Sequence, residues 1–307
     1  MPAACWKPFS PMSISDDLGL GEDRVIAVAG AGGKTSLIKA LGLALAQEGK
    51  RVLATTTTKV AASEFLAHDR LTPSHLGDLG LNVNRSLKQI GRADSRANPE
   101  PFNGSGFFRS ALDSWRCGTR IDSDRAPFFL YRKATDDGAK WIGLAPEAID
   151  ELAKSRKFDV ILVEADGSRR CPLKAPAAHE PVIPSCADGL ILVAGLSGFG
   201  RPLGEETVFR SDLWSAITEA GFNDPVTPND WWRVATDPRG YGRVLNPGRR
   251  NLMFLNQDDA PGAEEVFGQL TDLMQQEKGR FDGLAMGRLR PAPVLSRTWF
   301  DRQTISL

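Results

Sequence analysis

The chain has 307 residues, in which 38 Lys and Arg residues are balanced by 38 Asp and Glu residues. A net charge of zero gives no field that gathers polyanions, so the composition does not favour a nucleic-acid or anionic-membrane partner. The four cysteines form no C-x-x-C pair, no apolar run reaches the roughly 18 residues of a membrane span, and prolines interrupt the first residues where a signal peptide would be apolar. We therefore expect a cytoplasmic globular protein with neither a membrane nor a nucleic-acid partner.

The first elements of the chain follow the order strand, loop, helix, strand. Residues 1–23 contain several prolines and read as a flexible tail, and residues 24–29 (RVIAVA) are typical of a strand buried on both faces. After a glycine-rich loop, leucines recur every fourth residue and predict a helix that ends near Gly49. Residues 51–55 predict the next strand. This order predicts parallel strands joined by a right-handed crossover.

The rest of the chain continues this alternation after one interruption. Residues 68–126 are polar, rich in Pro, Gly and Asn, and without a hydrophobic period, so we expect an irregular insertion there. The other predicted elements are a pair of short strands at 128–131 and 141–144, strands at 158–163, 190–194 and 252–255, and helices at 146–157 and 262–278. The pattern favours one three-layer α/β domain over residues 24–307, with a mostly parallel, doubly wound sheet.

The strongest motif is the glycine-rich loop between the first strand and the first helix. It consists of Gly30, Ala31, Gly32, Gly33, Lys34 and Thr35, and Ser36 follows. Glycines there let backbone N–H groups surround a phosphate, and the helix N-terminus adds a partial positive charge. Lys34 would reach the β- and γ-phosphates of ATP or GTP, and the Thr35 hydroxyl would hold Mg²⁺. The simpler alternative is a glycine-rich turn with a solvated lysine.

A pair of carboxylates follows the strand predicted at 158–163. Glu164 and Asp166 lie on one face of an extended chain, at the edge of the sheet that carries the glycine loop. Carboxylates placed there orient Mg²⁺ or its water in phosphoryl-transfer sites. We therefore expect both residues to take part in metal binding and catalysis, although Asp-Gly is also a common turn pair.

Polar residues after two other strands extend the candidate site. Thr56 and Thr57 follow the second strand and are candidates for binding phosphate, Mg²⁺ or substrate. Arg169 and Lys174 come shortly after Asp166, and such cations would neutralise charge on a transferred phosphoryl group. The spacing fits a solvated basic loop equally well. Cys171, between them, has no partner base or resolving cysteine in the sequence pattern, so we assign it no role.

The residues that follow the strand at 252–255 bear on which base is bound. Asn256 and Asp259 stand in the pattern N-Q-D-D, close to the N-K-x-D of guanine-binding proteins, in which Asp accepts from the guanine N1 and N2 hydrogens. Gln257 replaces the lysine that would stack on the base. The pattern supports GTP binding and an ordinary Asx-rich loop to the same extent.

Taken together, these segments resemble the YqeC family, described as selenium cofactor biosynthesis proteins or selenium-dependent hydroxylase accessory proteins. The resemblance lies in residues 25–42, 53–60 and 158–184, with weaker agreement at 195–210 and 254–259. The chain departs from the family in the insertion 68–126, at Cys171 and at Gln257. The resemblance implies a P-loop NTPase-like fold and an accessory role for a molybdenum hydroxylase client.

Three functions are consistent with this sequence. The first is a Mg²⁺-dependent NTPase that serves cofactor maturation of a molybdenum hydroxylase. The second is a Mur-like ligase or small-molecule kinase whose acceptor docks near Lys174 and His179. The third is a nucleotide-gated chaperone or scaffold without catalysis of its own.

Overall fold

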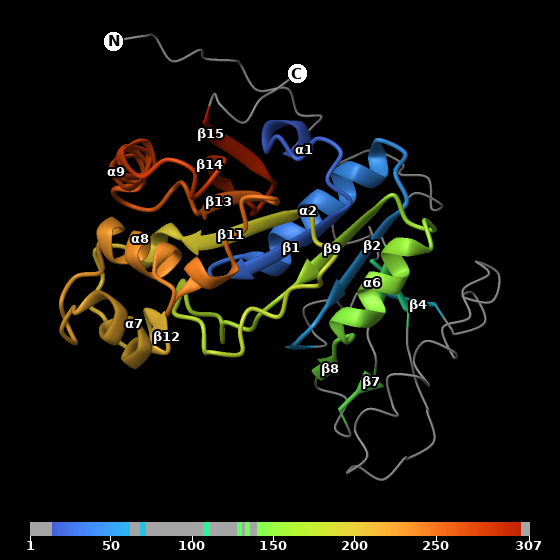
Figure 1. Cartoon of the computed structure of the whole chain (residues 1–307), viewed down its shortest axis with the longest axis horizontal. Helices are drawn as coiled ribbons and strands as arrows, with labels where there is room; N and C mark the ends of the chain where they lie inside the picture. The colour runs from blue at the N-terminus through green and yellow to red at the C-terminus, as the bar shows by residue number, and fades with distance from the viewer. Residues whose placement is uncertain are drawn as a thin grey trace.

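A ten-stranded sheet forms the centre of the molecule (Figure 1). The computed structural model describes residues 14–61, 68–71, 107–110, 128–130, 133–135 and 140–301. Across the sheet the strands are β15 (Val294–Phe300), β14 (Gly283–Arg288), β13 (Arg250–Asn256), β11 (Gly189–Gly195), β1 (Val25–Gly30), β9 (Val160–Glu164), β2 (Val52–Thr56), β6 (Phe128–Leu130), β5 (Phe107–Ser110) and β4 (His68–Leu71).

Most of the sheet is parallel. Every neighbouring pair from β14 to β6 runs parallel, whereas β15 at one edge and β5 and β4 at the other pair antiparallel. All residues of β1, β9 and β11 are buried, as expected for strands covered on both faces. The predicted three-layer, mostly parallel α/β fold is confirmed.

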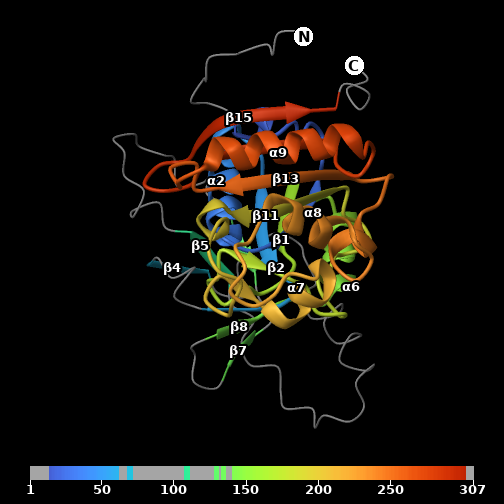
Figure 2. The ribbon, with the colours of Figure 1, turned by 90° about the vertical axis from the view of Figure 1, so that its left-hand side faces the viewer.

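Helices cover both faces of the sheet because successive side chains of each strand point to opposite sides. Ile26 and Val28 of β1 pack with α1 (Ile14–Asp17) and α2 (Lys34–Gln47). Val25 packs with α6 (Pro146–Lys154), and Ala27 packs in the cluster that includes α7 (Ser211–Thr218), α8 (Pro228–Thr236) and α9 (Ala263–Gln276). These last three helices lie on the same face of the sheet, and α8 contacts both α7 and α9 (Figure 2).

Smaller elements flank the main sheet. β10 (Leu173–Lys174) pairs with β12 (Val208–Phe209), and β8 (Lys140–Ile142) lies between β3 (Lys59–Ala61) and β7 (Lys133–Ala134). Two short 3-10 helices, η3 (Leu196–Gly198) and η4 (Tyr241–Val244), complete the described elements. Within these described ranges, no helix combines the length and the apolar character needed to cross a membrane.

The structure differs from the sequence predictions in three places. Part of the expected tail is ordered, because α1 lies within it and Leu18 and Leu20 are buried against the core. β4 and β5 lie within the expected insertion 68–126, and the rest of that segment is outside the described residues. The strands predicted at 128–131 and 141–144 are present as β6 and β8 with shifted bounds, and they lie in different sheets, since β6 joins the main sheet beside β2 and β8 joins the small sheet.

Candidate nucleotide-binding site

The glycine loop begins where β1 ends and is shaped by close backbone neighbours. Gly30, Gly32 and Gly33 all have positive φ angles, of 99°, 77° and 143°. A side chain on Gly32 would collide with the backbone of Gly195 and would come within 2.7 Å of the Pro172 carbonyl oxygen. Both the backbone conformation and the crowding therefore require glycine in this loop.

The loop leaves backbone donors unused at the start of α2. The Gly30 N–H donates to Asp166 Oδ2 and the Ala31 N–H to the Val193 carbonyl, so both serve the fold. Among the described residues, no acceptor faces the N–H groups of Gly32 and Gly33, and no side chain caps α2. The first turn of a helix, which here begins at Lys34, places further N–H groups at the same end of α2. This arrangement suits an anion.

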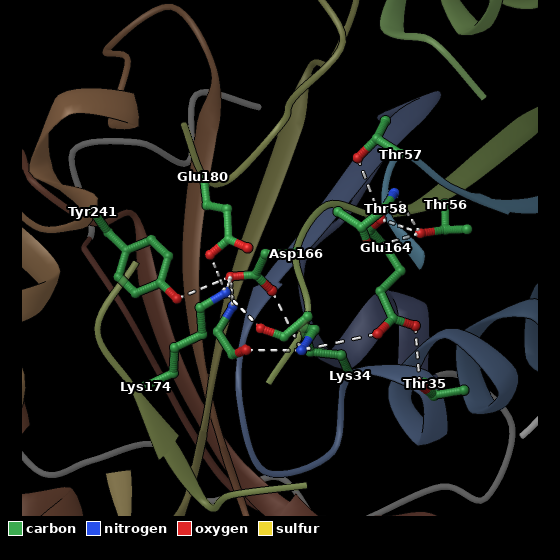
Figure 3. Close-up of polar contacts among 12 residues, drawn as sticks. Lys34, Thr35, Thr56, Thr57, Thr58, Glu164, Asp166, Lys174, Glu180 and Tyr241 are labelled. Carbon is green, nitrogen blue, oxygen red and sulfur yellow. Dashed lines mark hydrogen bonds and ion pairs between the residues drawn. The ribbon is translucent and has the colours of Figure 1, made fainter. Parts of the chain in front are cut away.

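The Lys34 ammonium lies beside the loop, between two carboxylates (Figure 3). Its ammonium donates to the Gly30 carbonyl at 2.8 Å and lies 3.3 Å from Asp166 Oδ1 and 3.9 Å from Glu164 Oε1. Only 3% of Lys34 is exposed. The side chain that we predict to bind phosphate is therefore held by two acidic partners and a backbone carbonyl.

Glu164 connects the last residue of β9 to the first turn of α2. It lies beside Val28 in the parallel register, and its Oε2 accepts a hydrogen bond of 2.9 Å from the Thr35 hydroxyl. The hydroxyl of Thr56 donates to the Glu164 carbonyl and that of Thr57 to the Val182 carbonyl, at 2.9 and 2.8 Å. These two hydroxyls thus satisfy backbone acceptors at the sheet edge.

Asp166 is held by three groups at one of its carboxylate oxygens. Its Oδ2 accepts from the Gly30 N–H at 3.1 Å and from the Tyr241 hydroxyl at 3.0 Å, and lies 2.9 Å from Lys174 Nζ. Its Oδ1 is buried and accepts no hydrogen bond within the described structure. Burial and the adjacent Asp166 carboxylate raise the pKa of Tyr241 well above its ordinary value, so the phenol stays protonated and donates.

A chain of alternating charges extends from Asp166 away from the loop. The Lys174 ammonium lies 2.7 Å from Glu180 and also donates to the Gly167 carbonyl, and Arg210 binds both oxygens of Glu180. Burial alone would raise the pKa of Glu180, but hydrogen bonds from Arg210 and Lys174 outweigh it and lower the pKa to about 2. Lys174 is completely buried, so its three donors are committed to the fold.

The other predicted basic and thiol groups lie outside this chain of contacts. Arg169 is exposed and stacks on the Phe209 ring, with its guanidinium carbon 5.0 Å from the ring centroid. His179 is also exposed. Cys171 donates to the Glu205 carbonyl, and burial raises the pKa of its thiol. A protonated, hydrogen-bonded thiol is a poor nucleophile, which agrees with assigning Cys171 no role.

The residues after β13 lie on the other side of the loop. Asn256 Nδ2 donates to the Gly32 carbonyl at 2.6 Å, and its Oδ1 is buried without a hydrogen bond from any described group. Gln257 accepts from the Ser197 hydroxyl at 2.7 Å, and Asp259 is exposed. The structure therefore brings Asn256 to the glycine loop and leaves Asp259 at the surface.

The donor set fits a magnesium ion that is shared with a phosphate. Within the described parts of the chain, no group of three or more His, Cys, Asp or Glu residues is arranged to hold a metal. Mg²⁺ bound with a nucleotide needs only one or two protein oxygens, because phosphate oxygens and water complete its octahedron. Thr35 and Glu164 supply such oxygens next to the loop, and Asp166 Oδ1 offers another that has no hydrogen bond.

The sequence analysis missed two residues of the site. Tyr241 reaches Asp166 from η4, 75 residues further along the chain, and Arg210 reaches Glu180 from the residue before α7. Neither residue stands at the end of a main-sheet strand, and of the two only Arg210 lies in a segment that resembles the family, residues 195–210. Their place in the site depends on how α7 and α8 pack, which no local pattern indicates.

The chain is similar to known proteins over most of its length. The family model described as "YqeC protein" matches residues 26–212, which include the glycine loop, β9, Lys174 and Arg210. "Uncharacterized protein YqeC" of Escherichia coli (strain K12) is 29% identical over 292 residues, which cover 95% of this chain and 98% of that protein. The match extends beyond the family model and includes the segment that carries Tyr241. The chain belongs to the YqeC family.

Proposed function

We propose that this protein binds a nucleoside triphosphate, ATP or GTP, with Mg²⁺ and hydrolyses it. One observation carries the proposal: the Thr35 hydroxyl is hydrogen-bonded to Glu164 at 2.9 Å, directly after a glycine loop with unused N–H groups. A hydroxyl and a strand-end carboxylate side by side at a phosphate-binding loop are the protein oxygens that a Mg²⁺-nucleotide complex requires.

Each residue of the site has a task in this proposal. The N–H groups of Gly32 and Gly33 and the first turn of α2 bind phosphate oxygens. The Lys34 ammonium exchanges its contact with Asp166 for one with the terminal phosphates. Thr35 and Glu164 hold the metal, and bound Mg²⁺ neutralises charge on the phosphates. Asn256 fixes the loop through the Gly32 carbonyl.

The cellular role in this proposal comes from the family resemblance alone. It is an accessory role in the maturation of a selenium- or molybdenum-containing hydroxylase, with that hydroxylase as client protein, in the cytoplasm. The ligase or kinase alternative loses a docking group in this structure, because the three donors of Lys174 are already bound. An accessory NTPase predicts slow turnover that a client accelerates, whereas a ligase predicts turnover that a small acceptor accelerates.

A melting-temperature panel tests nucleotide and metal binding together. We expect ATP or GTP with Mg²⁺ to stabilise the parent by about 2.7 kcal/mol when the ligand is at about 100 times its dissociation constant. In Glu164→Gln, nucleotide without metal should still raise the melting temperature as in the parent. The affinity for Mg²⁺ should fall roughly 10–100-fold, since an oxygen that binds or orients metal is lost. CTP serves as the base control.

Two outcomes contradict the proposal. One is a parent whose melting temperature no Mg²⁺-nucleotide raises. The other is a Glu164→Gln variant with an unchanged response to Mg²⁺. GTP specificity is tested separately with Asp259→Asn. If this carboxylate accepts hydrogen bonds from guanine, the variant should bind GTP more weakly and XTP more tightly than the parent.

A further inference from the structure

The two oxygens of Asp166 have unequal environments. Oδ2 is near three donors from three parts of the chain: the Gly30 N–H, the Tyr241 hydroxyl and the Lys174 ammonium, at 3.1, 3.0 and 2.9 Å. Oδ1 is buried, accepts no described hydrogen bond and lies 3.3 Å from Lys34. Figure 3 shows the carboxylate between Lys174 and Tyr241 on one side and Lys34 on the other. Such an arrangement fixes the carboxylate plane and directs one oxygen toward the loop.

The groups that bind Oδ2 are themselves held rigidly. Lys174 is also bound by Glu180 and the Gly167 carbonyl, and none of it is exposed. The ring of Tyr241 packs edge-on against Trp231, with 6.1 Å between the ring centroids. Trp231 stacks on Trp214, with 6.0 Å between the ring centroids. A buried aromatic stack therefore sets the position of the phenol. A carboxylate that served only to neutralise Lys34 would not require this support.

We propose that Tyr241 and Lys174 are positioning residues for Asp166, and that they hold its Oδ1 as a hydrogen-bond acceptor for the water that attacks the bound nucleotide. This inference rests on the proposed nucleotide hydrolysis. When Lys34 turns to the phosphates, Oδ1 loses its nearest cation and becomes available to that water. The water oxygen bonds to the terminal phosphorus, the bond from that phosphorus to the diphosphate oxygen breaks with its electron pair left on the diphosphate, and both protons of the water end on the released phosphate as H2PO4⁻.

Tyr241→Phe tests the role of the phenol because it removes one hydroxyl and keeps the ring that packs on Trp231. We expect kcat to fall about tenfold, as the loss of one hydrogen bond to a charged group implies, with KM and the nucleotide-induced melting shift unchanged. Thr218→Val is the matched control. It removes another buried hydroxyl of the same region, bonded to the Trp214 carbonyl at 3.0 Å, and should leave kcat unchanged.

A double-mutant cycle shows whether Tyr241 acts through Asp166. In an Asp166→Asn background, Tyr241→Phe should no longer lower the residual kcat, because the carboxylate that it positions is gone. The proposal is overturned if Tyr241→Phe lowers kcat by the same factor in the parent and in Asp166→Asn. It is also overturned if Thr218→Val lowers kcat as much as Tyr241→Phe does.

The same cycle, measured by denaturant unfolding, does not depend on turnover. If the phenol and Asp166 are coupled as proposed, the unfolding equilibrium constant of the double variant should differ several-fold from the product of the single effects. If the effects of the two single variants on the free energy of unfolding are additive, Tyr241 and Asp166 are not coupled and the inference is overturned. If the parent does not bind nucleotide but shows this coupling, the proposed hydrolysis is refuted, and so is the proposed role of Oδ1. The hydrogen bond by which Tyr241 positions Asp166 would still stand.

Discussion

Lys34 shows how the candidate site balances its charges. A lysine that is 3% exposed needs partners, because an unpaired buried charge is strongly destabilising, and here Glu164, Asp166 and the Gly30 carbonyl provide them. The same contacts keep the ammonium at the entrance of the glycine loop. In the proposed function, nucleotide binding would exchange one set of anions for another around a cation that is already in place.

Lys34→Ala should affect both binding and stability. We expect the loss of roughly 3–6 kcal/mol of nucleotide binding, since two charge-assisted hydrogen bonds to phosphate disappear. The free energy of unfolding should fall by about 3–5 kcal/mol, because two buried carboxylates lose their cation. Calorimetry and urea unfolding measure the two effects. Lys50→Ala is the control, since its exposed ion pair with Glu48 contributes at most about 1 kcal/mol. Parent-like nucleotide affinity in Lys34→Ala would refute phosphate binding by this residue.

The sequence allowed prediction of the site residues that follow main-sheet strands. Glu164 and Lys34 come together because β1 and β9 are parallel neighbours whose carboxyl ends meet. The threonines were harder to interpret, because a hydroxyl near a strand end is equally able to serve a ligand or a backbone carbonyl. In this protein Thr56 and Thr57 bind the carbonyls of Glu164 and Val182.

At the scale of elements, the glycine loop is constrained by two strands on one side of β1, namely β11 and β13. Gly32 lies against Gly195, the last residue of β11, and against Pro172, so the loop fits into a space with no room for a side chain. Gly33 faces Asn256 of β13 in the same way. The shape of the loop thus depends on two neighbouring strands as well as on its own residues.

Gly32→Ala should disrupt the loop more than a change of φ alone would. Strain at a positive φ of 77° costs about 1 kcal/mol, and the collision with backbone atoms adds to it, so we expect a loss of stability of about 2–4 kcal/mol and of nucleotide binding. Gly49→Ala is a matched control, because Gly49 has a φ of 88° but a Cβ atom there would meet no atom within 4 Å. It should lose about 1 kcal/mol and bind nucleotide normally. Equal effects of the two changes would show that crowding at Gly32 is unimportant.

The helices differ in how well their sequences predicted them. Residues 146–157 and 262–278 carry clear apolar periods, and α6 and α9 lie within those ranges. The helices α7 and α8 are short and were not predicted, although Thr227 and Asp230 form a capping box at the start of α8. These two helices carry the aromatic residues that support Tyr241, so the missed elements account for the missed site residue.

At the scale of the whole molecule, the two ends of the sheet strands carry different electrostatic arrangements. The carboxyl ends hold the candidate site, in which Glu180 is stabilised in its charged form. At the amino ends, burial and the neighbouring Asp188 raise the pKa of Asp23 to about 6, although its ion pair with Arg250 opposes the rise. The alternation of strands and helices predicted the fold class, but the order of the strands, and hence these clusters, follows from tertiary packing.

The pH dependence of the free energy of unfolding should report both ends. Glu180 has a pKa of about 2 in the folded protein against an ordinary value of 4.5, so the unfolded chain binds more protons between these values and stability falls as pH drops through this window. Asp23 has a pKa of about 6 against an ordinary value of 3.8, so the folded protein binds more protons there and stability falls as pH rises from about 4 to 6. Stability contributed by these two groups is therefore greatest between about pH 4 and 5.

Single amide variants separate the two contributions. The free energy of unfolding is measured with urea from about pH 2 to 7. In Asp23→Asn it should no longer fall between about pH 4 and 6, while its decrease at more acidic pH should stay as in the parent. Glu180→Gln should lower the free energy of unfolding at all of these pH values, since Lys174 and Arg210 lose a charged partner. The pH dependence of that free energy should become flatter only below about pH 4.5. If either variant keeps the parent's slope in its own window, the group it removes does not titrate as described. Because the two groups lie at opposite ends of the strands, the double variant should show the sum of both changes.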